Sequence, residues 1–150
     1  MNSAFCVAVH ALVYLNHKGC MLSSEELAEN ICTNPARVRK IMAALKKAGM
    51  VDTKEGSVGG YRFSGDPARL TLDQVADALD IRFVEAAWRS GDTDMACLVA
   101  SGMADLMDGV FADLDRRCRQ RLSEISIADL DEQIFHHQAA LKGRISNETV

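Results

Sequence analysis

Residues 34–63 read NPARVRKIMAALKKAGMVDTKEGSVGGYRF, and this stretch decides the fold. It opens as a helix, because Thr33 or Asn34 can cap the N-terminus and Pro35 suits the first helical position, where no N–H is needed. The helix closes at Gly49, a residue typical of helix ends. Apolar side chains in between recur three and four residues apart, which predicts one buried stripe of Val38, Ile41, Met42 and Leu45.

The second part of the stretch predicts a β-hairpin. Residues 50–54 form a short strand-like run, and Tyr61-Arg62-Phe63 alternates as a returning strand. At the glycine-rich tip between them, we expect Gly59 and Gly60 to adopt positive φ and to permit close approach to a phosphate chain. The hairpin is therefore predicted to be a wing beside the helix, with the Tyr61 ring packed under it.

Two more helices are predicted upstream. Residues 3–17 carry apolar side chains at helical spacing. Ser23 or Ser24, followed by Glu26, resembles an N-cap and begins a helix of about two turns. Residues 30–34 then form a turn. Two helices joined by a short turn, the second of them basic on its exposed face, are the organisation of a helix-turn-helix.

Downstream, the sequence predicts one short helix and a long helical region. Gly65-Asp66-Pro67 interrupts the chain, and Thr71 caps a helix that continues through Leu79. We expect a fold that is mainly α with a small β-hairpin wing. Its predicted parts are a winged helix-turn-helix domain at 1–80, a linker at 81–96, a dimerisation helix and a C-terminal helix within 97–141, and a frayed tail at 142–150.

The long helix carries an apolar stripe of six turns or more, too long for the winged domain to cover. Either this helix folds back across the N-terminal helices, or it pairs with the same helix of a second copy. We expect the second arrangement, a homodimer. The residues predicted at its interface are Met103, Leu106, Met107, Val110, Phe111, Leu114, Cys118 and Leu122, and Ile125 continues the stripe.

Charge is distributed unevenly along the chain. The net charge of the 150 residues is -4, yet residues 1–65 carry eight basic and five acidic side chains, a net +3. Residues 34–54 contain six basic side chains and one acidic side chain, Asp52, so the net charge of this segment is +5. Such a charge suits contact with phosphates. A basic helix face is also compatible with simple solvation, so charge alone does not decide between the two.

Double-stranded DNA is the predicted partner of the basic segment and the hairpin. We expect Arg37 to read guanine through its planar fork, and Arg39 and Lys40 to touch phosphates. Ala36 also lies off the buried stripe near the start of that helix. The full set of expected contact residues is Ser24, Thr33, Asn34, Arg37, Arg39, Lys40, Lys54, Ser57, Val58 and Gly59.

Composition excludes several classes of protein. Hydrophobic residues make up 48% and charged residues 25% of the chain, an ordinary globular balance. No apolar run reaches the roughly 18 residues that span a bilayer, and no secretory signal is present at the N-terminus. We therefore expect a cytoplasmic protein with no membrane partner. No catalytic triad order or phosphate loop is present, so we expect no enzyme activity.

The ordered series of motifs resembles the Rrf2 family of transcriptional regulators. The matching segments are Ala8-Val9-His10-Ala11-Leu12, Ser24 to Leu27, Val38 to Val51 with its Leu45-Lys46-Lys47-Ala48-Gly49, the wing Gly56-x-x-Gly59-Gly60-Tyr61, Leu70-Thr71-Leu72-x-x-Val75, and Leu122 to Leu130. The resemblance covers most of the chain. It implies a dimer on a roughly palindromic operator, with recognition helices in successive major grooves and wings at the minor groove.

Two departures from the family pattern affect what the resemblance implies. Many members carry an arginine just before the first wing glycine, where this chain has Glu55, and Lys54 is a possible substitute. Iron–sulfur members place three cysteines before the dimer helix, whereas residues 88–104 contain only Cys97. Since Cys118 lies too far along the helix to share a cluster with Cys97, we expect no cofactor. The histidines show no third ligand at standard spacing, so we expect no metal.

Cys97 is the expected sensing residue, at the junction of the linker and the long helix. A helix N-terminus lowers the pKa of a thiol, and the resemblance includes members with a lone cysteine here. The alternative is a small packed residue. The five scattered cysteines show no disulfide framework. Modification of Cys97 is expected to act at the base of the dimer helices.

Two functions remain open from the sequence. The first is a homodimeric, sequence-specific repressor that responds to a redox or thiol-reactive signal. The second is a winged-helix adaptor that binds proteins and has little DNA affinity, which Glu55 and the net charge of -4 favour. A steep loss of DNA affinity with added salt distinguishes the first from the second.

Overall fold

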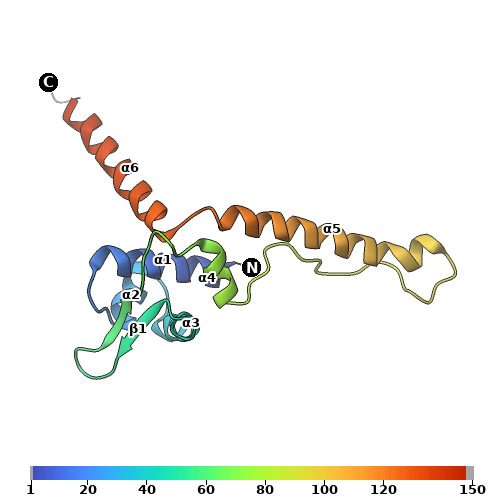
Figure 1. Ribbon diagram of the computed structural model, residues 1–150, viewed down its shortest axis with the longest axis horizontal. Helices are drawn as coiled ribbons and strands as arrows, with labels where there is room; N and C mark the ends of the chain where they lie inside the picture. The colour runs from blue at the N-terminus through green and yellow to red at the C-terminus, as the bar shows by residue number, and fades with distance from the viewer. Residues whose placement is uncertain (1, 148–150) are drawn as a thin grey trace.

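The computed structural model describes residues 2–147 and has the expected order of elements (Figure 1). Four helices and a hairpin form the winged domain, and two long helices follow it. The elements are α1 (Ser3–Lys18), α2 (Ser24–Ile31), α3 (Pro35–Lys47), β1 (Val51–Lys54), β2 (Gly60–Phe63), α4 (Leu72–Ala78), α5 (Leu98–Leu122) and α6 (Ile127–Asn147). The predicted fold class, mainly α with a β-hairpin wing, is confirmed.

Local capping chemistry sets the ends of α2 and α3. The Ser23 hydroxyl accepts the backbone N–H of Glu26, and the Glu26 carboxylate accepts the N–H of Ser23, which forms a capping box. The Asn34 side chain accepts the N–H of Ala36 at 2.7 Å and so begins α3. The short turn between the two helices places Cys32 at φ 58°, in the left-handed region. The capping box shows that Ser23, rather than Ser24, is the N-cap of α2.

The hairpin gains a third backbone partner from the segment before α2. In the antiparallel pair, Val51 lies opposite Phe63 and Lys54 opposite Gly60. Tyr61 also exchanges two backbone hydrogen bonds with Leu22, at 2.8 and 2.9 Å. This bridge holds β2 against the segment that precedes α2.

One hydrophobic core unites the winged domain with the start of α6. The largest fully buried side chains are Leu12 and Leu15 of α1, Leu27 of α2, Val38, Met42 and Leu45 of α3, Val75 of α4, and Ile127 of α6. All four members of the predicted α3 stripe are buried. The core therefore fixes the face that α3 turns outward.

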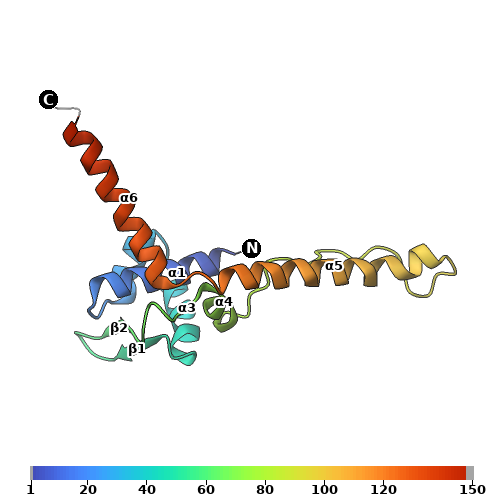
Figure 2. The ribbon, with the colours of Figure 1, turned by 45° about the horizontal axis from the view of Figure 1, so that its top comes forward.

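The two long helices leave the winged domain in different directions (Figures 1 and 2). α5 begins at the far end of the molecule and returns toward the domain, while α6 rises from the domain beside α1. No residue of α5 is buried within the protomer. Within residues 2–147, no helix is both long enough and apolar enough to cross a membrane.

Polar contacts fasten α5 to the domain and to the linker. The Arg119 guanidinium pairs with Asp73 and Asp77 of α4. Asp115 accepts the backbone N–H groups of Phe83 and Val84 at 2.7 and 3.0 Å. The C-terminal half of α5 therefore has a defined orientation relative to α4 and the first part of the linker.

The predicted apolar stripe ends earlier than expected, because the helix breaks after Leu122. The Ile125 carbonyl accepts the N–H of Leu72, and the N–H of Ile127 donates to the Leu70 carbonyl, both at 2.9 Å. These bonds align the connection with the residues before α4. Ser126 then caps α6 together with Asp129, each accepting the backbone N–H of the other.

The expected start of the tail at residue 142 was too early. α6 continues through Lys142 to Asn147. The run Ala139-Ala140-Leu141-Lys142 consists of strong helix formers and carries the helix up to residue 142.

Candidate nucleic-acid interface

The outward face of α3 is a row of two alanines and two lysines. Ala36, Lys40, Ala43 and Lys47 follow one another at spacings of four, three and four residues, and all four are exposed. They lie opposite the buried stripe of the same helix. We call this set the outer row. In both views, α3 and the hairpin lie on the side of the domain away from α6 (Figures 1 and 2).

A groove of about 400 Å³ runs beside the outer row, between α3, the start of α2 and the hairpin. Ala43 and Lys46 enter it from α3, Lys54 from β1, and Ser24 from α2. This groove brings three predicted contact residues together, namely Ser24, Lys54 and Gly59. It also contains Lys46 and Ala43, which were not among the predicted contacts. The spacing of Ala43 from Ala36 and Lys40, seven and three residues, was the signal that could have found it, whereas no such spacing marks Lys46.

Arg37 was predicted to face the groove of DNA, but the structure places it on a flank of α3. Its Nη2 donates to the Ser3 hydroxyl at the start of α1, at 2.6 Å. The turn of the helix explains this position, since Arg37 lies about 100° from Val38 and far from the middle of the exposed face. Arg37 therefore points toward α1 rather than along the outer row.

Arg39 lies on the opposite flank, against α2. Its Nη1 donates to the Ser24 hydroxyl at 3.1 Å and to Glu25 Oε1 at 3.2 Å. The pKa of Glu25 lies below its ordinary value, first because its own backbone N–H donates to it and then because of the Ser24 hydroxyl, with Arg39 adding to the effect. Both partners of the ion pair are more than half exposed, so the pair adds little stability and Arg39 can exchange Glu25 for a phosphate.

Three residues that were predicted to contact DNA are instead engaged within the protein, or are largely buried. Asn34 caps α3, so its side-chain oxygen is already occupied. Thr33 is half-buried, and its N–H donates to the Ala28 carbonyl in the turn. Ser24 retains only 9% exposure. These residues hold the helices in position more than they present side chains outward.

The wing tip is open to solvent. Lys54 and Ser57 are exposed, and the apolar residue Val58 is 78% exposed. Gly60 has φ +148°, as expected, but Gly59 does not adopt positive φ, which corrects that prediction. A Cβ at Gly59 meets the Lys54 carbonyl oxygen at 2.1 Å, so the close approach that needs glycine is to the chain itself.

The residues of the predicted dimer stripe do not share one environment. Met103, Leu106, Met107, Val110 and Leu114 are exposed large hydrophobic residues, and Leu106 is 68% exposed. We call these five residues the open stripe. By contrast, Phe111 faces the linker, and Leu122 packs against the core of its own winged domain. Cys118 is exposed on the same helix.

Cys97 is the residue that precedes α5, and it is exposed. The pKa of its thiol lies below the ordinary value, because the backbone N–H groups of Ala100 and then of Val99, at the start of α5, favour the thiolate. The direction agrees with the expected lowering by a helix N-terminus. Its expected position at the base of the dimer helices was wrong, since α5 begins at the end farthest from its own winged domain (Figure 1).

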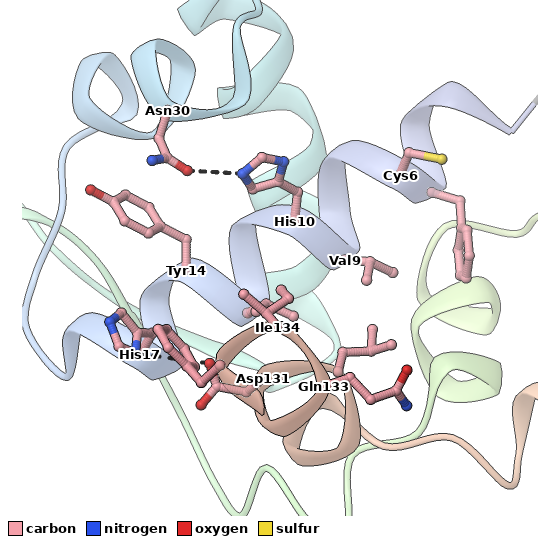
Figure 3. Close-up of a pocket in the computed structure, with 13 residues that line it drawn as sticks. Cys6, Val9, His10, Tyr14, His17, Asn30, Asp131, Gln133 and Ile134 are labelled. Atoms are coloured by element: carbon pink, nitrogen blue, oxygen red, sulfur yellow. Dashed lines mark hydrogen bonds and ion pairs between the residues drawn. The ribbon is translucent and has the colours of Figure 1, made fainter. Parts of the chain in front are cut away.

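A second cavity, of about 550 Å³, opens between α1 and α6 (Figure 3). His17 stacks on Phe135 with ring centroids 4.2 Å apart, and His17 Nδ1 lies 3.9 Å from Asp131 Oδ1. At the other end, His10 and Asn30 share a hydrogen bond of 2.8 Å. The contacts of His17 anchor the first turns of α6 on α1, whereas the hydrogen bond of His10 joins α1 to α2.

Comparisons with known proteins agree with this architecture. The family model described as "Rrf2: Iron-dependent Transcriptional regulator" matches residues 1–133. The chain is 28% identical over 137 residues to the "Putative HTH-type transcriptional regulator YwnA" of Bacillus subtilis. The aligned region covers 90% of this chain and 99% of that protein.

Solved structures support the same relation. The crystal structure of a "putative transcriptional regulator" from Lactobacillus plantarum is similar with a TM-score of 0.82 and 26% identity, over 98% of this chain and 99% of that one. The IscR protein of T. potens shares the fold, with a TM-score of 0.65 and 18% identity over 89% of this chain and 87% of its own.

The family description names iron, and the donor residues of this chain do not fit an iron site within one protomer. Iron–sulfur clusters need thiolates that converge on the metal. Among the described residues, no three Cys, His, Asp or Glu side chains are placed to hold a metal ion. Cys97 and Cys118 are separated along α5 by about 30 Å.

Proposed function

The chain belongs to the Rrf2 family of transcriptional regulators, and from this premise we propose that it is a homodimeric repressor with a thiol-based signal response. Its relatives are transcriptional regulators rather than enzymes, and the family binds DNA. The observation that carries the proposal is that one chain presents two separate exposed surfaces. The outer row and wing suit DNA, and the open stripe suits a second copy.

In the proposed complex, α3 enters the major groove and the wing lies over the adjacent minor groove. Lys40, Lys46, Lys47 and Lys54 supply positive charge along this surface, and Arg39 joins them when it leaves Glu25. These cations bind phosphates and set the register, while groups of the outer row meet base edges. Repression follows if the bound dimer occludes a promoter.

The proposed dimer pairs two α5 helices through the open stripe. An antiparallel arrangement places the two winged domains at opposite ends of the pair. With 25 residues, α5 is about 37 Å long. This length is close to the roughly 34–36 Å between half-sites one helical turn apart on DNA. The palindromic operator is inferred from this symmetry.

Cys97 is the proposed sensor. Its thiolate attacks the disulfide of a small oxidised thiol, a mixed disulfide forms at Cys97, and the other half leaves as a thiolate. In an antiparallel pair the modified end of α5 lies beside the winged domain of the partner. A bulky adduct there changes the angle between the protomers and hence the distance between the recognition helices.

We expect Cys97 to be the most reactive of the five exposed cysteines. At pH 7 its depressed pKa gives a larger thiolate fraction, so iodoacetamide labels it several-fold faster than Cys6, Cys20, Cys32 or Cys118. The rate falls as pH decreases through the pKa of Cys97, because the thiolate is then protonated. Mass spectrometry of peptides after timed labelling measures each rate, and equal labelling of all five contradicts the assignment.

The test of the proposed function is binding of the purified, reduced protein to DNA from upstream of its own gene. We expect tight binding that weakens by roughly a thousandfold between 50 and 200 mM salt, because many phosphate contacts release counterions. Mild disulfide treatment should lower the affinity of the parent protein and leave Cys97→Ser unchanged. Salt-sensitive binding without a response to oxidation discards the sensor alone, and no binding at low salt supports the adaptor.

A further inference from the structure

We propose that the recognition helix identifies its operator chiefly through the methyl groups of Ala36 and Ala43, which pack on the 5-methyl groups of thymines in the major groove. This inference rests on the proposed function. In it, Arg37 and Arg39 do not read bases but help to hold α3 in position in the groove. The operator is therefore a duplex that carries thymines at two defined places in each half-site.

Two alanines, and no arginine, lie at the middle of the exposed face of α3. Both alanines are exposed and belong to the outer row. The longer arginine side chains are held on opposite flanks, by Ser3 on one side and by Ser24 and Glu25 on the other. An alanine lets the helix backbone approach the base pairs closely, which a long side chain at the same place prevents.

Groove chemistry gives these alanines a partner. In the major groove, thymine presents a methyl group, whereas cytosine presents an amino group and no methyl. Apolar contact with alanine is one of the recognised ways to read the thymine methyl. Lys40 lies between the two alanines in the row and can bind guanine or a phosphate there.

Helix geometry predicts the spacing of the thymines. Ala36 and Ala43 are two turns apart, which corresponds to about 10.5 Å along the axis of α3. Base pairs rise by about 3.4 Å along each strand, so the two contacts fall roughly three base pairs apart when the helix follows the groove. A half-site with thymines two to four base pairs apart is therefore expected.

The test replaces single thymines by uracil, a change that removes the methyl group and nothing else. A duplex enriched from a random library by the full-length reduced protein serves as the probe, and affinities are measured by fluorescence anisotropy. At two thymines in each half-site we expect the substitution to weaken binding about fourfold, the effect of losing one buried methyl group. Other thymines should tolerate it.

Variants of the chain assign each thymine to one alanine. Ala36→Gly and Ala43→Gly should each abolish the response to uracil at one position and keep it at the other. Lys40→Ala is the matched control in the same row, and it should weaken the thymine and uracil duplexes equally. Circular dichroism and the elution volume show that each variant keeps its fold and its assembly.

The outcomes separate this inference from the proposed function. If an enriched duplex binds tightly but no uracil substitution changes its affinity, methyl readout is overturned and the regulator stands. The inference also fails if the uracil response survives both glycine variants, or if no thymines occur at the expected spacing. If the library yields no enriched sequence, both the inference and the proposed function fail.

Discussion

Leu106→Asp is expected to produce a monomer that binds operator DNA at least about a hundredfold more weakly than the parent chain. Leu106 is the most exposed member of the open stripe, and the proposed dimer buries it. The substitution places a carboxylate in that apolar surface on each protomer, where it lacks a partner. Loss of the dimer removes the effective concentration that joins two half-site contacts, an advantage of roughly 10²–10⁴.

Light scattering after gel filtration and fluorescence anisotropy measure the two parts of this prediction. Gln120→Glu is the control, because it adds the same charge at an exposed position of α5 outside the open stripe. The control should remain a dimer with unchanged affinity. A Leu106→Asp protein that stays dimeric and binds normally would show that the protomers meet through another surface.

Gly60→Ala is expected to destabilise the fold by about 3 kcal/mol or more, a large share of the 5–15 kcal/mol typical of a domain. A Cβ at this position lies 2.3 Å from the Leu22 carbonyl oxygen, which is backbone and cannot rotate away. The residue also has φ +148°, where side chains are strained. Relief of the contact requires breaking the bridge between Leu22 and Tyr61.

Thermal unfolding followed by circular dichroism, at matched protein concentration, measures this loss. We expect a decrease in Tm of roughly 6–12 °C. Gly56→Ala is the matched control, because Gly56 also has positive φ, but a Cβ added there meets no atom within 4 Å. The control isolates backbone strain and should lose much less. Equal losses for the two variants would contradict the importance of the close contact.

Several elements could be predicted from the sequence because their signals are local. Asn34 and Pro35 start α3, the repeat from Val38 to Leu45 forms its buried face, and Thr71 caps α4. Capping and helical spacing depend on residues within one or two turns of each other, so neighbouring positions are enough to reveal them.

Residues of the candidate site were harder to predict. Arg37 and Arg39 are two positions apart, yet their hydrogen bonds lead to Ser3 in one case and to Ser24 and Glu25 in the other. Which flank of α3 meets α1 and which meets α2 follows from packing between segments distant in the chain. Lys46 was missed for the same reason, since only the folded hairpin encloses it in the groove.

The sequence by itself determined the order of the elements, the buried face of α3 and the family, and it narrowed the caps of α2 and α3 to two neighbouring residues each. Only the tertiary structure decided that Leu122 packs on its own domain, that α5 ends at this residue, and that Cys97 lies at the end of α5 farthest from the winged domain. The physical reason is that periodicity shows which face of a helix is apolar but not what covers it. That choice depends on contacts between distant segments, such as the hydrogen bonds that Ile125 and Ile127 make beside α4.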